Sequence, residues 1–167
     1  MSRAYSGTEV LLGASAGDHQ LSYDIFLVNV EAVIYRDGRF LMIERGPGEN
    51  YGVGWLGFPG GKVDWDGEGR DVLERTAARE VAEEVGLNVD GPWHHVENKV
   101  FAIDELHILD VVLLARSDAG EPVIAAPDEV AAIAWMTAPQ ILADPRAQPW
   151  TRNSIDRCQL LLDTLGW

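Results

Sequence analysis

Apolar positions recur along this chain with two periods, and each period predicts one kind of element. Short runs of β-branched and other apolar residues between turn residues are typical of strands. Apolar residues at every third or fourth position are typical of helices with one buried face. The predicted strands are Phe26–Tyr35, Phe40–Ile43, Val100–Ile103, Leu106–Ala115 and Glu129–Met136, and the predicted helices are Asp71–Val85, Thr137–Ala143 and Thr151–Leu165.

The connections between these elements carry their own signals. Asp37-Gly38 lies between the first two strands and predicts a tight type I′ hairpin, which needs positive φ at both central residues. The stretch Gly46–Gly61 is rich in glycine and has no period, which indicates a loop. Gly86 follows the first helix at the position that favours a left-handed cap. The buried stripe of that helix is predicted to contain Ala77, Val81 and Val85.

Composition limits the class of protein. A chain of 167 residues with 47% hydrophobic content suits one compact domain, predicted here over residues 21–167 behind an arm of residues 1–20. The net charge of −14 argues against nucleic acid and anionic membranes as partners, and it leaves a homodimer open. Cys158 is the only cysteine, so no disulfide forms within the chain, and a reducing, cytoplasmic location is expected.

The most informative stretch is the acidic end of the first predicted helix, Arg79-Glu80-Val81-Ala82-Glu83-Glu84. Glu84 lies about 40° around the helix axis from Glu80, so the two carboxylates stack and repel each other. A divalent cation among exposed carboxylates would explain this crowding. The alternative is an ordinary solvated helix face, on which Arg79 and Glu83 form an i,i+4 ion pair.

The residues around this stretch resemble a known family. Gly61 to Leu87 is similar to the Nudix box, G-x5-E-x7-R-E-U-x-E-E-x-G-U with U aliphatic, and its second half fits without a gap. The preceding Trp55-Leu56-Gly57-Phe58-Pro59-Gly60-Gly61-Lys62-Val63 resembles the approach to that box. The resemblance implies an α/β fold, a Nudix-like α/β/α sandwich with a mixed β-sheet. It also implies hydrolysis of a nucleoside diphosphate linked to another group.

The first half of the box departs from the pattern. Its glutamate falls at Gly67 when counted from Gly61 and at Asp71 when counted back from Arg79, so four residues are inserted between. Either Glu68 or Asp71 could replace the missing glutamate. Asp71 could equally be the N-cap of the helix, with the third helical residue, Glu74, as its capping-box partner.

The resemblance also implies roles for individual residues. Glu80, Glu83 and Glu84 would hold Mg²⁺ or Mn²⁺, and the carbonyl of Gly61 would complete the shell. Arg79 would orient its acidic neighbours. Two residues are candidates for the general base, Glu80 and Glu129. Glu129 precedes the last predicted strand in a loop, and it could equally be an ordinary polar loop residue.

The resemblance implies a small nucleotide as substrate, and the sequence allows a choice among nucleotides only by elimination. Candidates for contacting it are the aromatic residues Tyr51, Trp55 and Phe58 together with Lys62. Relatives acting on ADP-ribose or dinucleoside polyphosphates carry a Pro or Tyr in the stretch that here runs from Ala102 to Leu106 and contains neither. A nucleoside triphosphate, oxidised or not, is therefore the first choice and a nucleotide sugar the second. The alternative is a nucleotide-sensing module without turnover.

Overall fold

A computed structural model of the chain describes residues 24–65, 67 and 69–167. It begins with a hairpin of β1 (Phe26–Arg36) and β2 (Arg39–Arg45). Asp37 and Gly38 between them have φ of 48° and 76°, as a type I′ turn requires. The predicted hairpin is confirmed.

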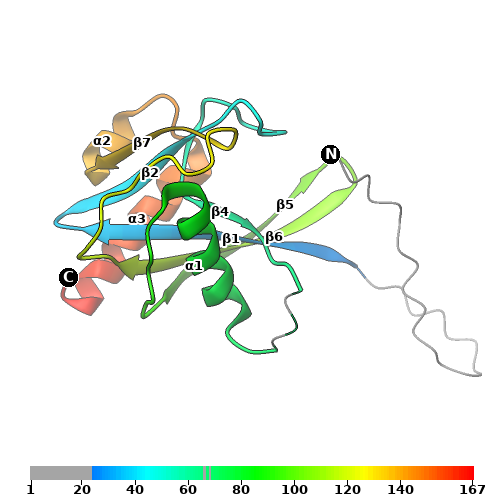
Figure 1. Cartoon of the computed structure of the whole chain (residues 1–167), viewed down its shortest axis with the longest axis horizontal. Coiled ribbons are helices and arrows are strands. Elements are labelled where there is room, and N and C mark those ends of the chain that lie inside the picture. The colour runs from blue at the N-terminus through cyan, green and yellow to red at the C-terminus, as the bar shows by residue number, and fades with distance from the viewer. Residues whose placement is uncertain (1–23, 66, 68) are drawn as a thin grey trace, which may run out of the picture.

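A mixed sheet of seven strands forms the centre of the fold (Figure 1). The five strands of its main path lie in the order β3-β2-β1-β6-β5, while β4 pairs with β1 and β7 pairs with β2. Among the strand pairings of the described residues, only that of β1 with β6 is parallel, from Phe26 opposite His107 to Tyr35 opposite Arg116. The remaining strands are β3 (Leu56–Gly57), β4 (Gly60–Lys62), β5 (His94–Ile103), β6 (Leu106–Arg116) and β7 (Val130–Met136).

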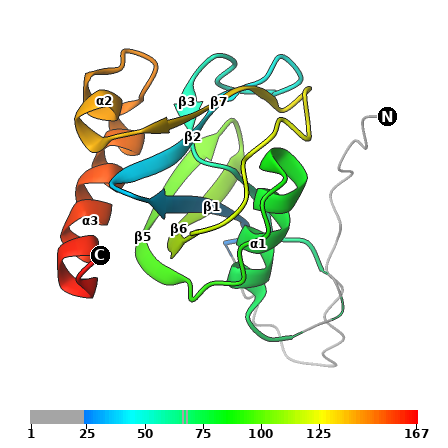
Figure 2. The same cartoon turned by 60° about the vertical axis from the view of Figure 1, so that its left-hand side comes forward.

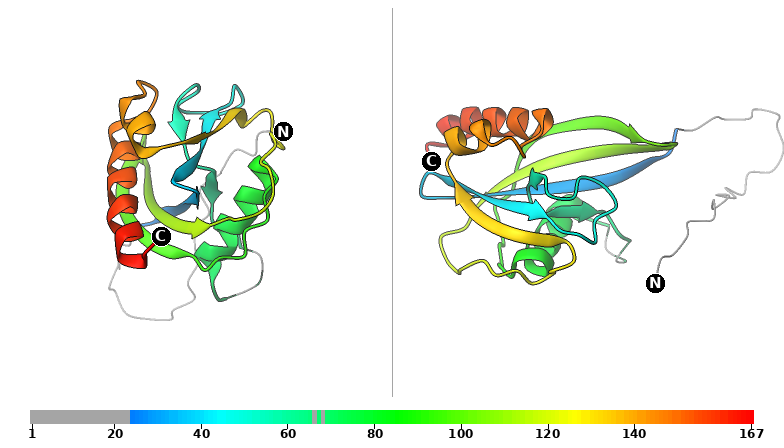
Figure 3. Two further views of the ribbon diagram at one scale, coloured as in Figure 1. Left: turned by 90° about the vertical axis from the view of Figure 1, so that its left-hand side faces the viewer. Right: turned by 90° about the horizontal axis from the view of Figure 1, so that it is seen from above.

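Helices cover both faces of this sheet, which gives the expected three-layer arrangement. Helix α1 (Val72–Val85) lies on one side, and α2 (Ala138–Ala143) and α3 (Pro149–Leu165) lie on the other (Figures 2 and 3). Each side has its own hydrophobic core. The residues predicted to form the buried stripe of α1 are all fully buried in the core beneath that helix: Ala77, Val81 and Val85.

Several boundaries differ from the sequence prediction for physical reasons. β5 begins at His94 rather than Val100, because an edge strand with a solvent-facing side keeps polar residues that hide its period. The loop Gly46–Gly61 contains the short strands β3 and β4, which are too brief to show a pattern. α3 begins at Pro149 because proline suits the first turn of a helix.

The expected capping box at the start of α1 is wrong. Asp71 occupies the N-cap position, but its backbone is left-handed, with φ of 51°, and its side chain makes no capping hydrogen bond. At the other end, Gly86 has φ of 67° and caps the helix as predicted, with its N–H donating to the carbonyl of Ala82.

No helix in the described part of the chain is long and apolar enough to cross a membrane. The N-terminal arm of residues 1–20 and the candidate Glu68 lie outside the described residues.

Candidate active site

The site is built where β4 passes beside α1. β4 pairs with β1, with Gly61 opposite Val30 and Gly60 opposite Glu31. A Cβ atom on Gly61 would come within 2.5 Å of Cδ of Glu80, so the Glu80 carboxylate lies directly over the glycine. The missing side chain of Gly61 therefore makes room for a carboxylate of the helix.

Glu84 is the most buried acid of this group, which corrects the expectation that it is exposed. The residue is 3% exposed, and one carboxylate oxygen, Oε1, accepts a 3.5 Å hydrogen bond from the backbone N–H of Gly60. The other oxygen, Oε2, is buried and has no hydrogen-bond partner among the described residues. Burial, followed by the nearby charge of Glu80, raises the pKa of Glu84 to about 8.

Arg79 holds two of the predicted acids at once. Its Nη2 lies 2.7 Å from Oε1 of Glu80 and donates to the carbonyl oxygen of Lys62 at 3.0 Å, while its Nη1 donates to Oε2 of Glu83 at 2.9 Å. Burial raises the pKa of Glu80, and Arg79 opposes that rise. Arg79 thus forms the ion pair with Glu83 and also contacts Glu80, the neighbour that it is predicted to orient.

The three glutamates predicted as one group divide into two environments. Glu80 and Glu84 are 7% and 3% exposed, but the side chain of Glu83 is 58% exposed. Glu83 therefore lies at the rim, while Glu80 and Glu84 point into the protein.

Glu129 approaches this group from another part of the chain. The segment before β7 passes the C-terminal end of α1, where the N–H of Val123 donates to Val85 O and that of Ala125 donates to Glu84 O (Figure 2). Glu129 is exposed, and its charge raises the pKa of both Glu80 and Glu84. The fold therefore brings the predicted remote acid close to the acidic helix.

Glu49 is an acid of the site that the sequence analysis missed. Its charge contributes to the raised pKa of Glu84, and burial and the charge of Glu129 raise its own pKa. Glu49 lies in the aperiodic loop after β2, and no motif marks it. Its nearness to the other acids follows only from the packing of this loop against the segment before β7.

The carboxylate side chains of this group are suitable ligands for a divalent cation. They offer anionic oxygen donors, and the unpartnered Oε2 of Glu84 is a buried oxygen that a cation could satisfy. Within the part of the chain that the structure describes, no three acidic, histidine or cysteine side chains already surround a common point. These residues therefore fit such an ion by the charge of their oxygen atoms and by the burial of Glu84.

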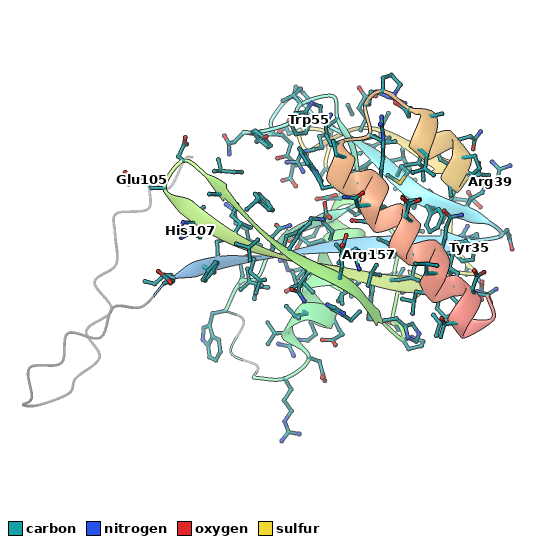
Figure 4. All side chains as sticks on the ribbon, turned by 180° about the vertical axis from the view of Figure 1, so that it is seen from behind. Tyr35, Arg39, Trp55, Glu105, His107 and Arg157 are labelled. Carbon is teal, nitrogen blue, oxygen red and sulfur yellow. The ribbon has the colours of Figure 1, made fainter. Side chains whose placement is uncertain are left out.

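Two of the predicted substrate-contacting residues, Tyr51 and Trp55, lie in an aromatic cluster with Trp150. Tyr51 and Trp55 make an edge contact with centroids 4.9 Å apart, and Trp55 meets Trp150 at 5.6 Å. Tyr51 and Trp150 are 49% and 39% exposed, and Figure 4 shows Trp55 beside the start of α3. Trp150 was missed because it is far away in the sequence. Phe58 is corrected: it is buried in the core beneath α3 and presents no face to a ligand.

The two remaining candidates lie at the surface. Lys62 is exposed at the end of β4, and its carbonyl oxygen, rather than its ammonium group, makes the contact with Arg79. Asp71 is exposed at the N-cap of α1.

Comparisons with known proteins agree with the fold. The NUDIX domain family model matches residues 26–158. A MutT NUDIX hydrolase from Burkholderia pseudomallei has 30% identity and a TM-score of 0.67, and the match covers 80% of this chain and 98% of that protein. A search of curated proteins found no significant match.

Two structures of lower sequence identity share the fold, and their names mention nucleotides. The NUDIX domain of Shewanella oneidensis NrtR, complexed with ADP ribose, has 20% identity and a TM-score of 0.68, covering 84% of this chain and 90% of that one. A C. elegans Ap4A hydrolase has 18% identity and a TM-score of 0.65, covering 83% and 98%. The family match over most of the chain and the relative at 30% identity lead to one conclusion: this chain belongs to the NUDIX domain family.

Proposed function

We propose that this protein is a metal-dependent hydrolase that cleaves the pyrophosphate linkage of a nucleoside diphosphate derivative. The first-choice substrate is a nucleoside triphosphate, oxidised or not, and a nucleotide sugar is the second. Water would attack one phosphorus of the linkage, giving a nucleoside monophosphate and pyrophosphate, or a sugar phosphate from a nucleotide sugar. The observation that carries the proposal is the buried, unpartnered carboxylate oxygen of Glu84 within an acidic cluster.

The acids of α1 would hold the cation. Glu80 and Glu84 face the protein interior, and Glu83 would supply a further carboxylate oxygen from the rim. The carbonyl oxygen of Gly61 is the proposed backbone ligand. When bound, Mg²⁺ or Mn²⁺ would neutralise phosphate oxygens and lower the pKa of a coordinated water. Arg79 would fix the orientation of Glu80 through their 2.7 Å contact.

Glu129 is the better of the two candidate bases. A general base must reach the attacking water. Glu80 is buried and tied to Arg79, whereas Glu129 is exposed and its backbone is held by the N–H of Gly46 at 2.6 Å. We therefore assign Glu129 the role of accepting the proton of the water.

The substrate would extend from the acidic cluster toward the aromatic residues. Tyr51 and Trp150 offer exposed ring area for stacking a nucleobase, the half-buried Trp55 contacts both of them, and Lys62 would contact phosphate. The ADP ribose bound by the distant Shewanella oneidensis domain is a nucleoside diphosphate linked to another group, which supports this class of ligand.

A substrate screen tests the proposal. Nucleoside triphosphates, their oxidised forms and nucleotide sugars are incubated with Mg²⁺ or Mn²⁺, and released pyrophosphate or sugar phosphate is measured. We expect turnover that stops on chelation and falls about a hundredfold or more in E84Q. Saturable nucleotide binding without any product would instead favour a nucleotide-sensing module and overturn the proposed hydrolysis.

A further inference from the structure

The loop after β2 is attached to the segment before β7 at two points. The backbone N–H of Gly46 donates to the carbonyl of Glu129 at 2.6 Å, and that of Gly48 donates to the carbonyl of Asp128 at 2.7 Å. Cβ atoms at these glycines would lie 2.5 and 2.8 Å from Asp128 O, so only glycine permits the approach. Glu49 follows directly, and it is therefore held next to Glu129.

Glu49 also lies near enough to the acidic helix for its charge to raise the pKa of Glu84. The charges of Glu80, Glu129 and Glu49 all raise the pKa of the Glu84 carboxylate, so acids from three segments of the chain lie near it. The side chain of Glu83, by contrast, lies at the rim of the group and is 58% exposed. The Oε2 atom of Glu84 is buried and has no hydrogen-bond partner among the described residues.

We propose that Glu49 is a cation-binding residue of this site, a carboxylate that the loop after β2 supplies opposite Glu84. This proposal rests on the divalent cation of the proposed function. It extends the cation site beyond α1. It also explains why the partly buried carboxylate of Glu49 lies near other carboxylates. The expected ligand class is Mg²⁺ or Mn²⁺, because hard cations take carboxylate oxygens from several segments.

The competing explanation is purely structural. Glu49 Oε2 lies 2.6 Å from Nη2 of Arg45, whose Nε donates to the carbonyl of Tyr51 at 3.0 Å. Glu49 could therefore serve only to neutralise Arg45 and order the loop. The two explanations differ in what happens when both charges are removed.

Cation binding without nucleotide provides the test. Isothermal titration with Mn²⁺ compares the full chain with E49Q, E84Q and E105Q, with circular dichroism as a check of folding. Glu105 is an exposed acid at the tip of the β5–β6 hairpin, well apart from Trp55 in Figure 4, so E105Q controls for the loss of one negative charge. We expect the dissociation constant to rise about tenfold or more in E49Q and E84Q, and less than about twofold in E105Q.

The double variant R45Q/E49Q separates the two explanations. If Glu49 binds the cation, the double variant stays as weak as E49Q, and R45Q alone binds at least as tightly as the wild type. Recovery of wild-type affinity in the double variant would show that Glu49 only neutralises Arg45, and would overturn the inference. E49Q behaving like E105Q while E84Q binds weakly would overturn it too, with the proposed function intact. Unchanged Mn²⁺ binding in E84Q would overturn both this inference and the proposed function.

Discussion

The N–H of Gly60 points at one oxygen of Glu84, at 3.5 Å, and leaves the other oxygen of that buried carboxylate without a partner among the described residues. A buried carboxylate normally has hydrogen bonds or a counter-charge, because its ionised form is otherwise costly. The strands and the helix thus hold Glu84 in a state that a cation would stabilise. Stability and cation binding are linked at this residue.

The first prediction concerns the stability of the metal-free protein. The pKa of Glu84 is about 8 in the fold against 4.5 for the ordinary group, so the folded state binds the extra proton between these values. Stability is therefore lost as the pH rises from about 4.5 to about 8. In chelator, E84Q should exceed the wild type at pH 8.5 by on the order of 2 kcal/mol, and by little at pH 4.5. Urea unfolding at both pH values measures this, and equal stabilities at pH 8.5 would contradict it.

The second prediction concerns the space that Gly61 leaves. A Cβ there would displace the Glu80 carboxylate, which is the mobile end of a flexible side chain. G61A should therefore unfold within about 1 kcal/mol of the wild type. Its turnover should nevertheless fall about tenfold to a hundredfold, because a carboxylate of the site moves.

Gly57 provides the matched control for G61A. A Cβ at Gly57 meets nothing within 4 Å, so G57A should keep both stability and turnover. Denaturation midpoints and product release for the two variants check this pair. An active G61A would mean that Glu80 need not lie over the glycine.

The same contacts show how far sequence reasoning could go. Spacing alone predicted that Val81 and Val85 are buried, because helical geometry fixes which side chains share a face. It could not tell that Glu83 turns outward while Glu84 is buried, since that depends on where β4 and the segment before β7 lie. The burial of Glu84 is a tertiary property.

The residues that the sequence missed share one cause. Glu49 and Trp150 belong to a loop and to the first turn of a distant helix, and they join the site only through packing. Phe58 was a candidate because it is aromatic, but its side chain packs in the core beneath α3. Local sequence patterns identify secondary-structure elements and motifs. The residues that contact a motif from distant parts of the chain depend on how strands and loops pack in the fold.

The third prediction concerns Gly46. A Cβ there would lie 2.5 Å from the carbonyl oxygen of Asp128 and 2.7 Å from the carbonyl carbon of Glu129. These are backbone atoms, so the clash cannot be relieved by rotating a side chain. G46A should therefore lose about 2 kcal/mol of stability, as strained backbone substitutions do.

G46A should also bind Mn²⁺ more weakly, because its loop carries Glu49 and touches Glu129. Gly69 is the control, since a Cβ at that position meets nothing within 4 Å. Urea unfolding and Mn²⁺ titration distinguish the two variants. A G46A protein as stable as G69A would show that the two segments can separate at little cost.

The last prediction concerns a charge cluster on the α3 side of the sheet. Nζ of Lys99 lies 2.9 Å from Glu31 and 3.0 Å from the buried Asp110. Burial and the charge of Asp110 raise the pKa of Glu31 to about 7, and Lys99 opposes that rise. Removing the ammonium group in K99M leaves two neighbouring carboxylates without their cation. The folded state should then lose about 3 kcal/mol at pH 8.5.

The sign of the pH dependence makes this prediction specific. Without Lys99 the pKa of Glu31 rises further, so the folded state takes up protons more readily than the unfolded chain as the pH falls. The deficit of K99M should therefore shrink toward pH 5. Arg157 provides the comparison: it also pairs with a strand residue, Glu97, at 2.8 Å, but its side chain is 60% exposed. R157M removes the same charge and should cost less than about 1 kcal/mol at either pH. Equal losses in K99M and R157M would mean that burial does not strengthen the Lys99 contacts.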